Sequence, residues 1–232
     1  MAIRPVFRKN INPPHFEELN IDFTFFSGFS ESQQQKSVTS LHRAYLEKYP
    51  ESKILEVSTH SPSLLGKRLS AFNLKYRYDN EWYSVENIFQ SSKCFSGGGP
   101  YRDILYVQPY EAKKDERLKE SGSLLKFSFD GVDYPLEPKT LFYDWLFINA
   151  LAQNRDLHEE LLKYNAFTDI AFNPKKSINC QARTCAIFVS LVSTGLLNDA
   201  LDSPSVFREL VYEFEMEPDP ENVQMSIFED FL

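Results

Sequence analysis

The sequence predicts a helix-rich α+β fold built as one domain. Segments with helical periodicity outnumber those that resemble strands, and no internal repeat is found. A chain of 232 residues suits one domain, and a hydrophobic content of 42% is ample for one core. The chain has neither a GxGxxG nor a P-loop pattern, so a doubly wound nucleotide-binding sheet is not indicated.

The first third of the chain alternates between extended and helical segments. Residues 1–20 contain Pro and Asn and predict an irregular arm. A polar loop at 30–36 precedes a helix at 37–49, which carries apolar residues on one face and stops at Pro50. Turns are expected at 61–66 and 79–80. The extended segments expected here are 23–29, 54–57 and 69–78.

The rest of the chain is mostly helical. Ser84 is a good N-cap for the first of these helices, and Gly195 allows a turn before the last. Residues 124–134 predict a hairpin around the Asp130–Gly131 turn, and 167–172 a short extended segment. Helices are expected over residues 85–95, 109–121, 137–151, 156–164, 180–192 and 196–201.

The negative charge is concentrated at one end of the chain. The net charge is −8, and residues 213–232 hold seven acidic and no basic residues, so the body is nearly neutral. A body without a global basic field must use a local patch on nucleic acid, or grip a single modified nucleotide. We therefore expect residues 1–53 to form an N-terminal arm, strand and helix packed on the core. Residues 54–212 are expected to form the catalytic core, and 213–232 an acidic tail.

The cysteines and the N-terminus bound the compartment. Cys94, Cys180 and Cys185 make no disulfide framework, and no partner pair with zinc-ligand spacing follows, so no metal site is expected. The start lacks an apolar signal core, and no apolar run approaches the length of a membrane span. These features predict a reduced, cytoplasmic protein without a membrane partner.

The helix after Ser84 carries the first candidate site. Glu86, Gln90 and Lys93 follow at i, i+4 and i+7, so a continuous helix would project them from one face. They could form an ordinary solvated polar stripe. In a closed pocket, however, a Glu acts as a general acid, and a Lys whose charge is disfavoured attacks an aldehyde or imine.

A second candidate is the polar segment 167–183, which precedes an apolar helix. It contains every type of hydrogen-bonding side chain, Gln181 among them, and Ser177 or Asn179 could cap the helix. The helix N-terminus, with Lys176 and its basic neighbours, would suit a diphosphate. An ordinary polar loop with a cap is an equally good interpretation.

Two shorter segments are weaker candidates. Gly98 and Gly99 belong to a glycine run whose backbone N–H groups could surround an anion, or which could simply end the helix. Ser70, Phe72 and Asn73 could stack on a base and bond its edge, or could form an ordinary strand end.

These residues resemble the NADAR (YbiA-like) superfamily. Residues 85–95 resemble its motif of V-E, an aromatic residue, Q, a small residue and K followed by F, and residues 69–73 resemble its earlier F-S-N-F element. Residues 154–162 are similar to its middle helices, and Asn179 matches an Asn that opens its last helix. The resemblance spans about residues 54–200, and it implies a single NADAR-like domain with short strands and a central ligand cleft.

A narrower resemblance is to the NADAR subgroup paired with DarT toxins. It rests on residues 98–101, 135–139, 142–145 and 167–170. Those toxins attach ADP-ribose to guanine in DNA, and their NADAR partners are antitoxins that hydrolyse the bond. The resemblance therefore implies an ADP-ribosyl glycohydrolase that acts on guanine in DNA, releases ADP-ribose and has a DarT-type toxin as a possible partner.

The resemblance also assigns roles to residues. It implies Glu86 as catalytic, and Asp169 is the best match to the family's acidic residue before the last helix. Two departures are found: Tyr134 stands where the wider family often has Trp, and the W-G pair that follows the family's acidic residue is absent. Tyr134 is therefore counted among the expected ligand-binding residues.

The chemistry of this bond leaves two routes open. The bond from ribose C1 to the exocyclic amine is a glycosylamine, which breaks through an oxocarbenium ion or by ring opening to an imine. Glu86 would manage protons in either route. Lys93 would form a transient Schiff base in the second route, or would instead pair with a phosphate. No cofactor or metal is expected to be needed.

Other functions remain possible at this stage. One is the N-glycosidase reaction on ribosylated pyrimidine intermediates of riboflavin synthesis, which is also attributed to YbiA-like proteins. Others are an ADP-ribose reader that binds without cutting, and an antitoxin that blocks its toxin as a protein. Release of free ADP-ribose from modified DNA separates the hydrolase from all of them.

Overall fold

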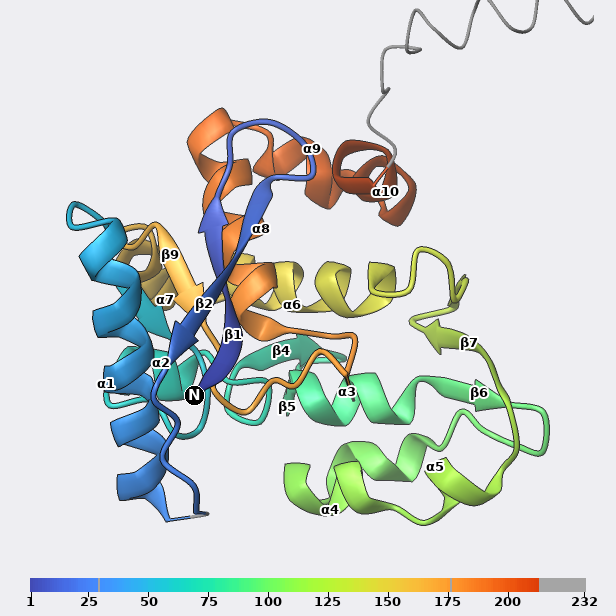
Figure 1. The fold of residues 1–232 in the computed structure, drawn as a ribbon. Helices are drawn as coiled ribbons and strands as arrows, with labels where there is room; N and C mark the ends of the chain where they lie inside the picture. Colours follow the sequence, from blue (N-terminus) through green and yellow to red (C-terminus); the bar gives the residue numbers. More distant parts are fainter. Residues whose placement is uncertain (29, 176, 213–232) are drawn as a thin grey trace, which may run out of the picture.

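The structure, a computed structural model, describes residues 1–28, 30–175 and 177–212. It confirms a helix-rich mixture of helices and short strands. The expected acidic tail and Lys176 lie outside the described residues. Within them, the strands form a four-stranded sheet of order β2-β1-β9-β3 and two smaller sheets, β4-β5 and β6-β7-β8 (Figure 1).

The chain begins with a hairpin and not with the irregular arm that the sequence predicts. β1 (Ala2–Lys9) pairs with β2 (Phe16–Phe23) along their whole length, and residues 24–28, which were expected to form a strand, do not. Pro5 is tolerated because β9 pairs only with Phe7 and Arg8, so Pro5 has a partner strand on one side alone.

The first helix starts earlier than its apolar pattern suggests. α1 (Glu31–Lys48) includes most of the segment expected as a loop, because the side chain of Ser30 accepts a hydrogen bond from the backbone N–H of Gln33. Its buried face includes Val38, Leu41 and Tyr45, which pack with residues of β1 and β2.

Two parallel strands lead toward one edge of the main sheet. β3 (Ile54–Glu56) is confirmed near its expected place and pairs in parallel with β9 (Ala166–Thr168), with Glu56 opposite Thr168. Residues that follow the two strands therefore emerge at the same edge. The turn expected at 61–66 is partly replaced by the short helix α2 (Leu64–Arg68), and the extended chain expected over 69–78 is wrong for residues 69–73, which form turns.

The next hairpin prepares the start of a buried helix. β4 (Lys75–Tyr78) and β5 (Glu81–Ser84) meet at the expected turn, where Asp79 and Asn80 have φ of 49° and 64°. As predicted, Ser84 caps α3 (Val85–Ser91) by accepting from the backbone N–H of Asn87.

The expected helix over 85–95 is too long. α3 ends at Ser91, and β6 (Lys93–Phe95) pairs with β7 (Leu124–Phe129). The hydroxyls of Ser91 and Ser92 both donate to the carbonyl of Ile88 at this point, and the following backbone bonds to β7 instead of continuing the helix. Lys93 is therefore on a strand.

The segment between the two strands is more broken than predicted. A 3-10 helix, η1 (Arg102–Tyr106), precedes α4 (Pro109–Lys114) and α5 (Arg117–Glu120), where one charged helix was expected. The break lies at Asp115, whose carboxylate accepts from the backbone N–H of Arg117. The hairpin of β7 and β8 (Val132–Tyr134) around Asp130–Gly131 is confirmed.

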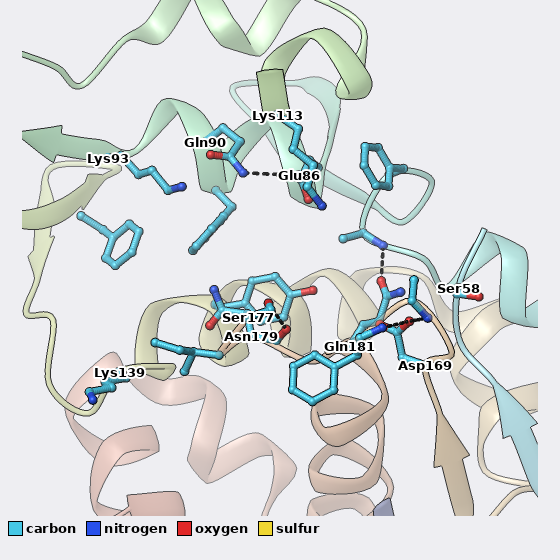
Figure 2. Close-up of a pocket in the computed structure, with 18 of the residues that line it drawn as sticks. Ser58, Glu86, Gln90, Lys93, Lys113, Lys139, Asp169, Ser177, Asn179 and Gln181 are labelled. Atoms are coloured by element: carbon cyan, nitrogen blue, oxygen red, sulfur yellow. Dashed lines mark hydrogen bonds between the residues drawn. The ribbon is translucent and has the colours of Figure 1, made fainter. Parts of the chain in front are cut away.

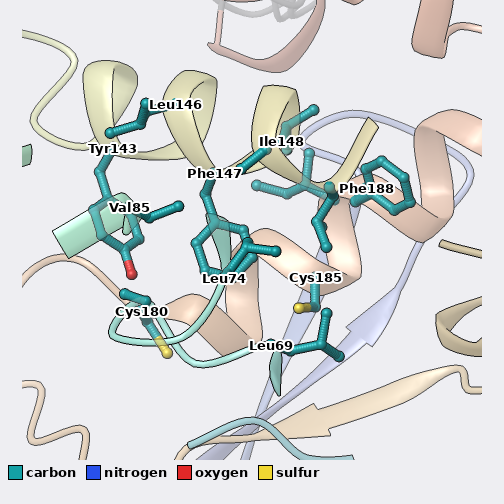
Figure 3. Close-up of a cluster of buried hydrophobic side chains, with 14 of the residues drawn as sticks. Leu69, Leu74, Val85, Tyr143, Leu146, Phe147, Ile148, Cys180, Cys185 and Phe188 are labelled. Carbon is teal, nitrogen blue, oxygen red and sulfur yellow. The ribbon is translucent and has the colours of Figure 1, made fainter. Parts of the chain in front are cut away.

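Two apolar helices form the centre of the core. α6 (Leu141–Gln153) begins later than expected, after Pro138, and packs on α8 (Gln181–Thr194), which is close to its prediction. Figure 3 shows Phe147, Phe188 and Leu74 within this core. The remaining helices are α7 (Arg155–Leu161), α9 (Leu197–Asp202) and α10 (Pro204–Tyr212).

A buried carboxylate joins α6, α8 and α10. Asp144 is completely buried and accepts from Arg183 at 2.7 Å, from the hydroxyl of Thr184 at 2.5 Å and from the hydroxyl of Tyr212 at 2.5 Å. An ionised carboxylate out of water needs such partners, since removal of one leaves an uncompensated charge. The cluster therefore fixes the relative positions of the three helices.

We expect Arg183→Met to lower the free energy of unfolding by about 3–5 kcal/mol, because it strands the charge of Asp144 in the core. The matched control is Arg68→Met, whose partner Asp156 is solvent-exposed and whose pair is worth no more than about 1 kcal/mol. Urea unfolding followed by circular dichroism measures both. Equal losses in the two variants would contradict the role assigned to the cluster.

Candidate functional site

A cavity of about 660 Å³ opens where α3, α4 and the N-terminus of α8 converge. The segments that follow β3 and β9, and the stretch between β8 and α6, complete its walls. It brings together the three residues expected to be catalytic, Glu86, Lys93 and Asp169 (Figure 2). The volume is in the range of pockets that bind small molecules and cofactors.

Glu86 lies on the first turn of α3 with its carboxyl group at the cavity wall. Only 6% of the residue is exposed, and its Oε1 accepts a hydrogen bond of 2.7 Å from the side-chain amide of Gln90. The i, i+4 spacing that the sequence analysis used is therefore present for this pair. Gln90 in turn keeps a buried Oε1 that has no hydrogen-bond partner among the described residues.

Lys93 reaches the same cavity from strand β6. No hydrogen bond or ion pair of its ammonium group is seen in the described part of the chain, and its Nζ lies 4.9 Å from the centre of the Phe89 ring. Burial lowers the pKa of Lys93, the charge of Lys113 lowers it further, and the charge of Glu86 opposes both effects. A lysine in this position has an increased share of the neutral, nucleophilic amine.

Asp169 follows β9 on the opposite wall. Its Oδ1 accepts from the backbone N–H groups of Ala171 and Phe172, and its carboxylate is also bonded by the side chain of Gln181. Burial raises the pKa of Asp169 to about 6, although these hydrogen bonds and the charge of Lys113 work in the other direction.

Gln181 connects this wall to the one formed by residues 70–74. Its Oε1 accepts from the backbone N–H of Ala71 at 2.8 Å. The ring of Phe72, beside Ala71, lines the cavity, and the ammonium of Lys113 lies 5.2 Å from its centre. The aromatic face expected for stacking is thus inside the cavity.

Asn179, just before α8, also lines the cavity. Its Oδ1 is buried and has no partner within the described residues. It does not cap α8, whose N-cap is Cys180. Asn179 and Gln90 therefore offer acceptors on two walls, each suited to a ligand hydroxyl or N–H group.

Five residues expected to bind the ligand are not brought to the cavity. Ser70 and Asn73 both donate to the carbonyl of Lys67, so they stabilise the turn after α2. Tyr134 is buried against Phe142, with ring centres 4.7 Å apart. The other two are Gly98 and Gly99.

The two glycines support the strand that carries Lys93. They form a tight turn in which Phe95 bonds with Gly98, and Gly99 has a φ of 84°. A Cβ at Gly99 would lie 2.5 Å from the carbonyl oxygen of Lys93, so only glycine fits here without a shift of the backbone. These two glycines therefore allow close packing in the turn after β6.

Several cavity residues were not predicted from the sequence. Ser58 follows β3, Tyr143 lies on α6, and Lys113 and Lys139 lie on exposed parts of the rim. Burial raises the pKa of Tyr143 well above its ordinary value, and the charge of Glu86 adds to the effect. None of these residues stands in a recognisable local pattern, since the cavity gathers them only through the tertiary fold.

No group of three or more His, Cys, Asp or Glu side chains that could hold a metal ion is found among the described residues. In the same part of the chain, no helix is long and apolar enough to cross a bilayer.

The comparisons with known proteins give one family. The family model described as DarT1-associated NADAR antitoxin matches residues 2–221, which is nearly the whole chain. A search of curated proteins finds no match.

We expect Lys93 to lose its proton at a lower pH than an exposed lysine. The Glu86→Gln substitution should lower the pKa of Lys93 further. The reason is that the Glu86 carboxylate favours the charged ammonium, so its removal shifts the balance toward the free amine. The pH dependence of amine labelling, read by peptide mass spectrometry, measures this, with exposed Lys163 as internal control. The result contradicts this account if Lys93 and Lys163 label with the same pH profile.

Proposed function

The chain belongs to the DarT1-associated NADAR antitoxin family, and from this premise we propose that it removes ADP-ribose from the exocyclic amine of guanine in DNA. The observation that carries the proposal is the cavity, which places a buried carboxyl group, Glu86, and a lysine with a lowered pKa, Lys93, on adjoining walls. This pair matches the chemistry that a glycosylamine requires.

The proposed reaction proceeds by ring opening. A proton donated to the ribose ring oxygen breaks its bond to C1, and the exocyclic nitrogen of guanine forms an imine with C1. The neutral amine of Lys93 then adds to C1, and the guanine amine leaves after it takes up a proton. Departure of this amine restores the guanine, and water then hydrolyses the resulting Lys93 Schiff base, which gives free ADP-ribose and restores the lysine.

Two carboxyl groups are available to move these protons. Glu86 is the proposed acid and base, since it lines the same cavity as Lys93 and is fixed by Gln90. Asp169, on the opposite wall, has a pKa raised to about 6, so it exchanges a proton near neutral pH. We assign it the hydration step or the handling of a ribose hydroxyl.

The remaining cavity residues suit the other parts of the substrate. Phe72 offers a face to a base, while the free acceptors of Gln90 and Asn179 suit ribose hydroxyls. Lys113 and Lys139 on the rim supply positive charge for the diphosphate or the DNA backbone. If the cavity binds one modified nucleotide in this way, residues 1–212 need no overall positive charge to act on DNA.

We expect Glu86→Gln to reduce turnover of ADP-ribosylated guanine DNA by about 10²- to 10⁴-fold while the protein stays folded, because the amide cannot carry the proton. The measurement is steady-state release of ADP-ribose from a modified oligonucleotide. Glu160→Gln, at an exposed pair with Lys163, is the matched control and should remain active. Turnover by Glu86→Gln within a few-fold of wild type would remove Glu86 from its role as acid and base.

We expect Lys93→Arg and Lys93→Ala to be equally inactive, although arginine keeps the positive charge and could still hold a phosphate. Borohydride added during turnover should trap an ADP-ribose adduct on the wild type and none on either variant. Lys126→Arg, on the neighbouring strand β7, is the control and should behave as wild type. An active Lys93→Arg protein, with no adduct on the wild type, would move Lys93 to phosphate binding and favour an oxocarbenium route.

A further inference from the structure

A second buried carboxyl group lies behind Asp169. Glu56, the last residue of β3, is 1% exposed. Its Oε1 accepts from the hydroxyl of Ser58 at 2.6 Å and from the backbone N–H of Ile170 at 2.8 Å, and its Oε2 is bonded to the hydroxyl of Thr168 at 2.6 Å. Glu56 therefore binds the residues on both sides of Asp169.

The hydrogen-bonded chain continues away from the cavity. Thr168 Oγ1 also lies 2.8 Å from Nε2 of His42 on α1. His42 lines a separate groove on α1, whereas Ser58 lines the cavity. The chain Ser58–Glu56–Thr168–His42 thus extends from the cavity wall to the groove on α1.

We propose that Glu56 is a positioning residue, which holds Asp169 in the cavity and sets its affinity for a proton by carrying or releasing one proton of its own. The proposal rests on the role proposed above for Asp169. It differs from that role because Glu56 does not line the cavity and acts only through its neighbours.

The surroundings of Glu56 favour its protonated form. Burial raises the pKa of Glu56 to about 8, the charge of Asp169 adds to this, and the hydrogen bonds from Ile170, Ser58 and Thr168 oppose it. At pH 7, Glu56 therefore holds its proton while most of Asp169 is ionised. Above about pH 8, a second negative charge appears beside Asp169 and raises its proton affinity, because like charges disfavour each other.

The titratable groups that face this pair come from several elements. The charge of Lys113 lowers the pKa of Asp169, and burial lowers the pKa of His42 to about 4, so His42 is neutral at pH 7. The other groups that interact with Asp169 are Tyr143, Cys180 and Cys185, whose pKa values are all raised by burial.

Protonation of Glu56 reverses the direction of the hydrogen-bonded chain. When Glu56 is ionised, Thr168 donates to its Oε2 and accepts from an Nε2–H of His42. When Oε2 carries the proton, Glu56 donates to Thr168, and the Thr168 hydroxyl donates to a bare Nε2 of His42. The tautomer of neutral His42 thus reports whether Glu56 is protonated.

The test is an NMR titration of the whole protein without substrate, using side-chain ¹³C shifts of the carboxyl groups and ¹⁵N shifts of the His42 ring. The wild type should show a carboxyl transition near pH 8, with His42 changing from the Nδ1–H to the Nε2–H tautomer in the same pH range. The Glu56→Gln variant should show neither the carboxyl transition nor the tautomer change of His42. The reason is that the introduced amide mimics the protonated acid: its oxygen accepts hydrogen bonds, and its NH₂ group donates to Thr168.

Asp169→Asn provides the reciprocal measurement. It should move the Glu56 transition to lower pH, since the neighbouring charge that raises it is gone. Asp156→Asn, on the exposed surface of α7, is the control and should leave the Glu56 transition in place. A Glu56 that titrates in the ordinary range of glutamate, or one that is insensitive to Asp169→Asn, overturns the proposal.

Kinetics separates the two forms of Glu56, neutral and ionised. At pH 7, Glu56→Gln should keep kcat within about twofold of wild type, since one hydrogen bond of similar strength replaces another. Glu56→Ala should lower kcat by roughly 10²-fold, the cost of a misplacement of about 1 Å, with the same fold by circular dichroism. Loss of kcat in Glu56→Gln equal to that in Glu56→Ala would contradict a neutral Glu56.

A wild type that releases no ADP-ribose from modified DNA would instead defeat the proposed function. In that case the substrate-free titrations still decide whether Glu56 controls the ionisation of Asp169.

Discussion

The bond between the buried carboxylate of Asp144 and the guanidinium of Arg183 is the interaction on which the rest of the structure depends. It joins α6 to α8, and each helix carries cavity residues next to this contact: Tyr143 precedes Asp144, and Gln181 lies two residues before Arg183. Because Thr184 and Tyr212 complete the shell of the carboxylate, the two helices have one favourable arrangement. The relative position of α6 and α8 therefore determines the shape of the cavity.

Desolvation is the common physical cause behind the chemistry of the site. Burial disfavours charge on every group, so it lowers the pKa of Lys93 and raises the pKa values of Asp169 and Glu56. The result is an amine and two carboxyl groups that exchange protons closer to neutral pH than free side chains do. In the proposed reaction Lys93 is the nucleophile, Glu86 and Asp169 move the protons, and Glu56 holds Asp169 in place.

Local signals in the sequence identified part of this arrangement. Ser84 caps α3 as predicted, and the i, i+4 pair of Glu86 and Gln90 is present because one helical turn is enough to define it. Lys93 was expected on the same helix, but its backbone pairs with β7, more than 30 residues later in the chain. That pairing is non-local, so helical periodicity could not reveal it.

The same reason explains the cavity residues that were missed, since Tyr143, Lys113 and Ser58 reach the cavity only through packing of separate elements. The β1–β2 hairpin is a different case: its pairing is local, and it was missed because the Pro and Asn residues of 1–20 indicated an irregular arm. Gly98, Gly99 and Tyr134 were recognised as unusual residues, yet their constraint is close packing around β6 and in the core. A sequence pattern can therefore single out a constrained residue without showing whether the constraint is ligand binding or packing.

The central claim is that the cavity cleaves ADP-ribose from guanine in DNA, and a direct comparison of substrates tests it. The measurement is kcat/KM of the wild-type protein for an oligonucleotide with one ADP-ribosylated guanine and for a ribosylated pyrimidine, with products identified by mass spectrometry. Our account predicts free ADP-ribose and unmodified guanine from the oligonucleotide, and a much higher kcat/KM for it than for the pyrimidine. Binding of the oligonucleotide without release, or a preference for the pyrimidine, would contradict the account.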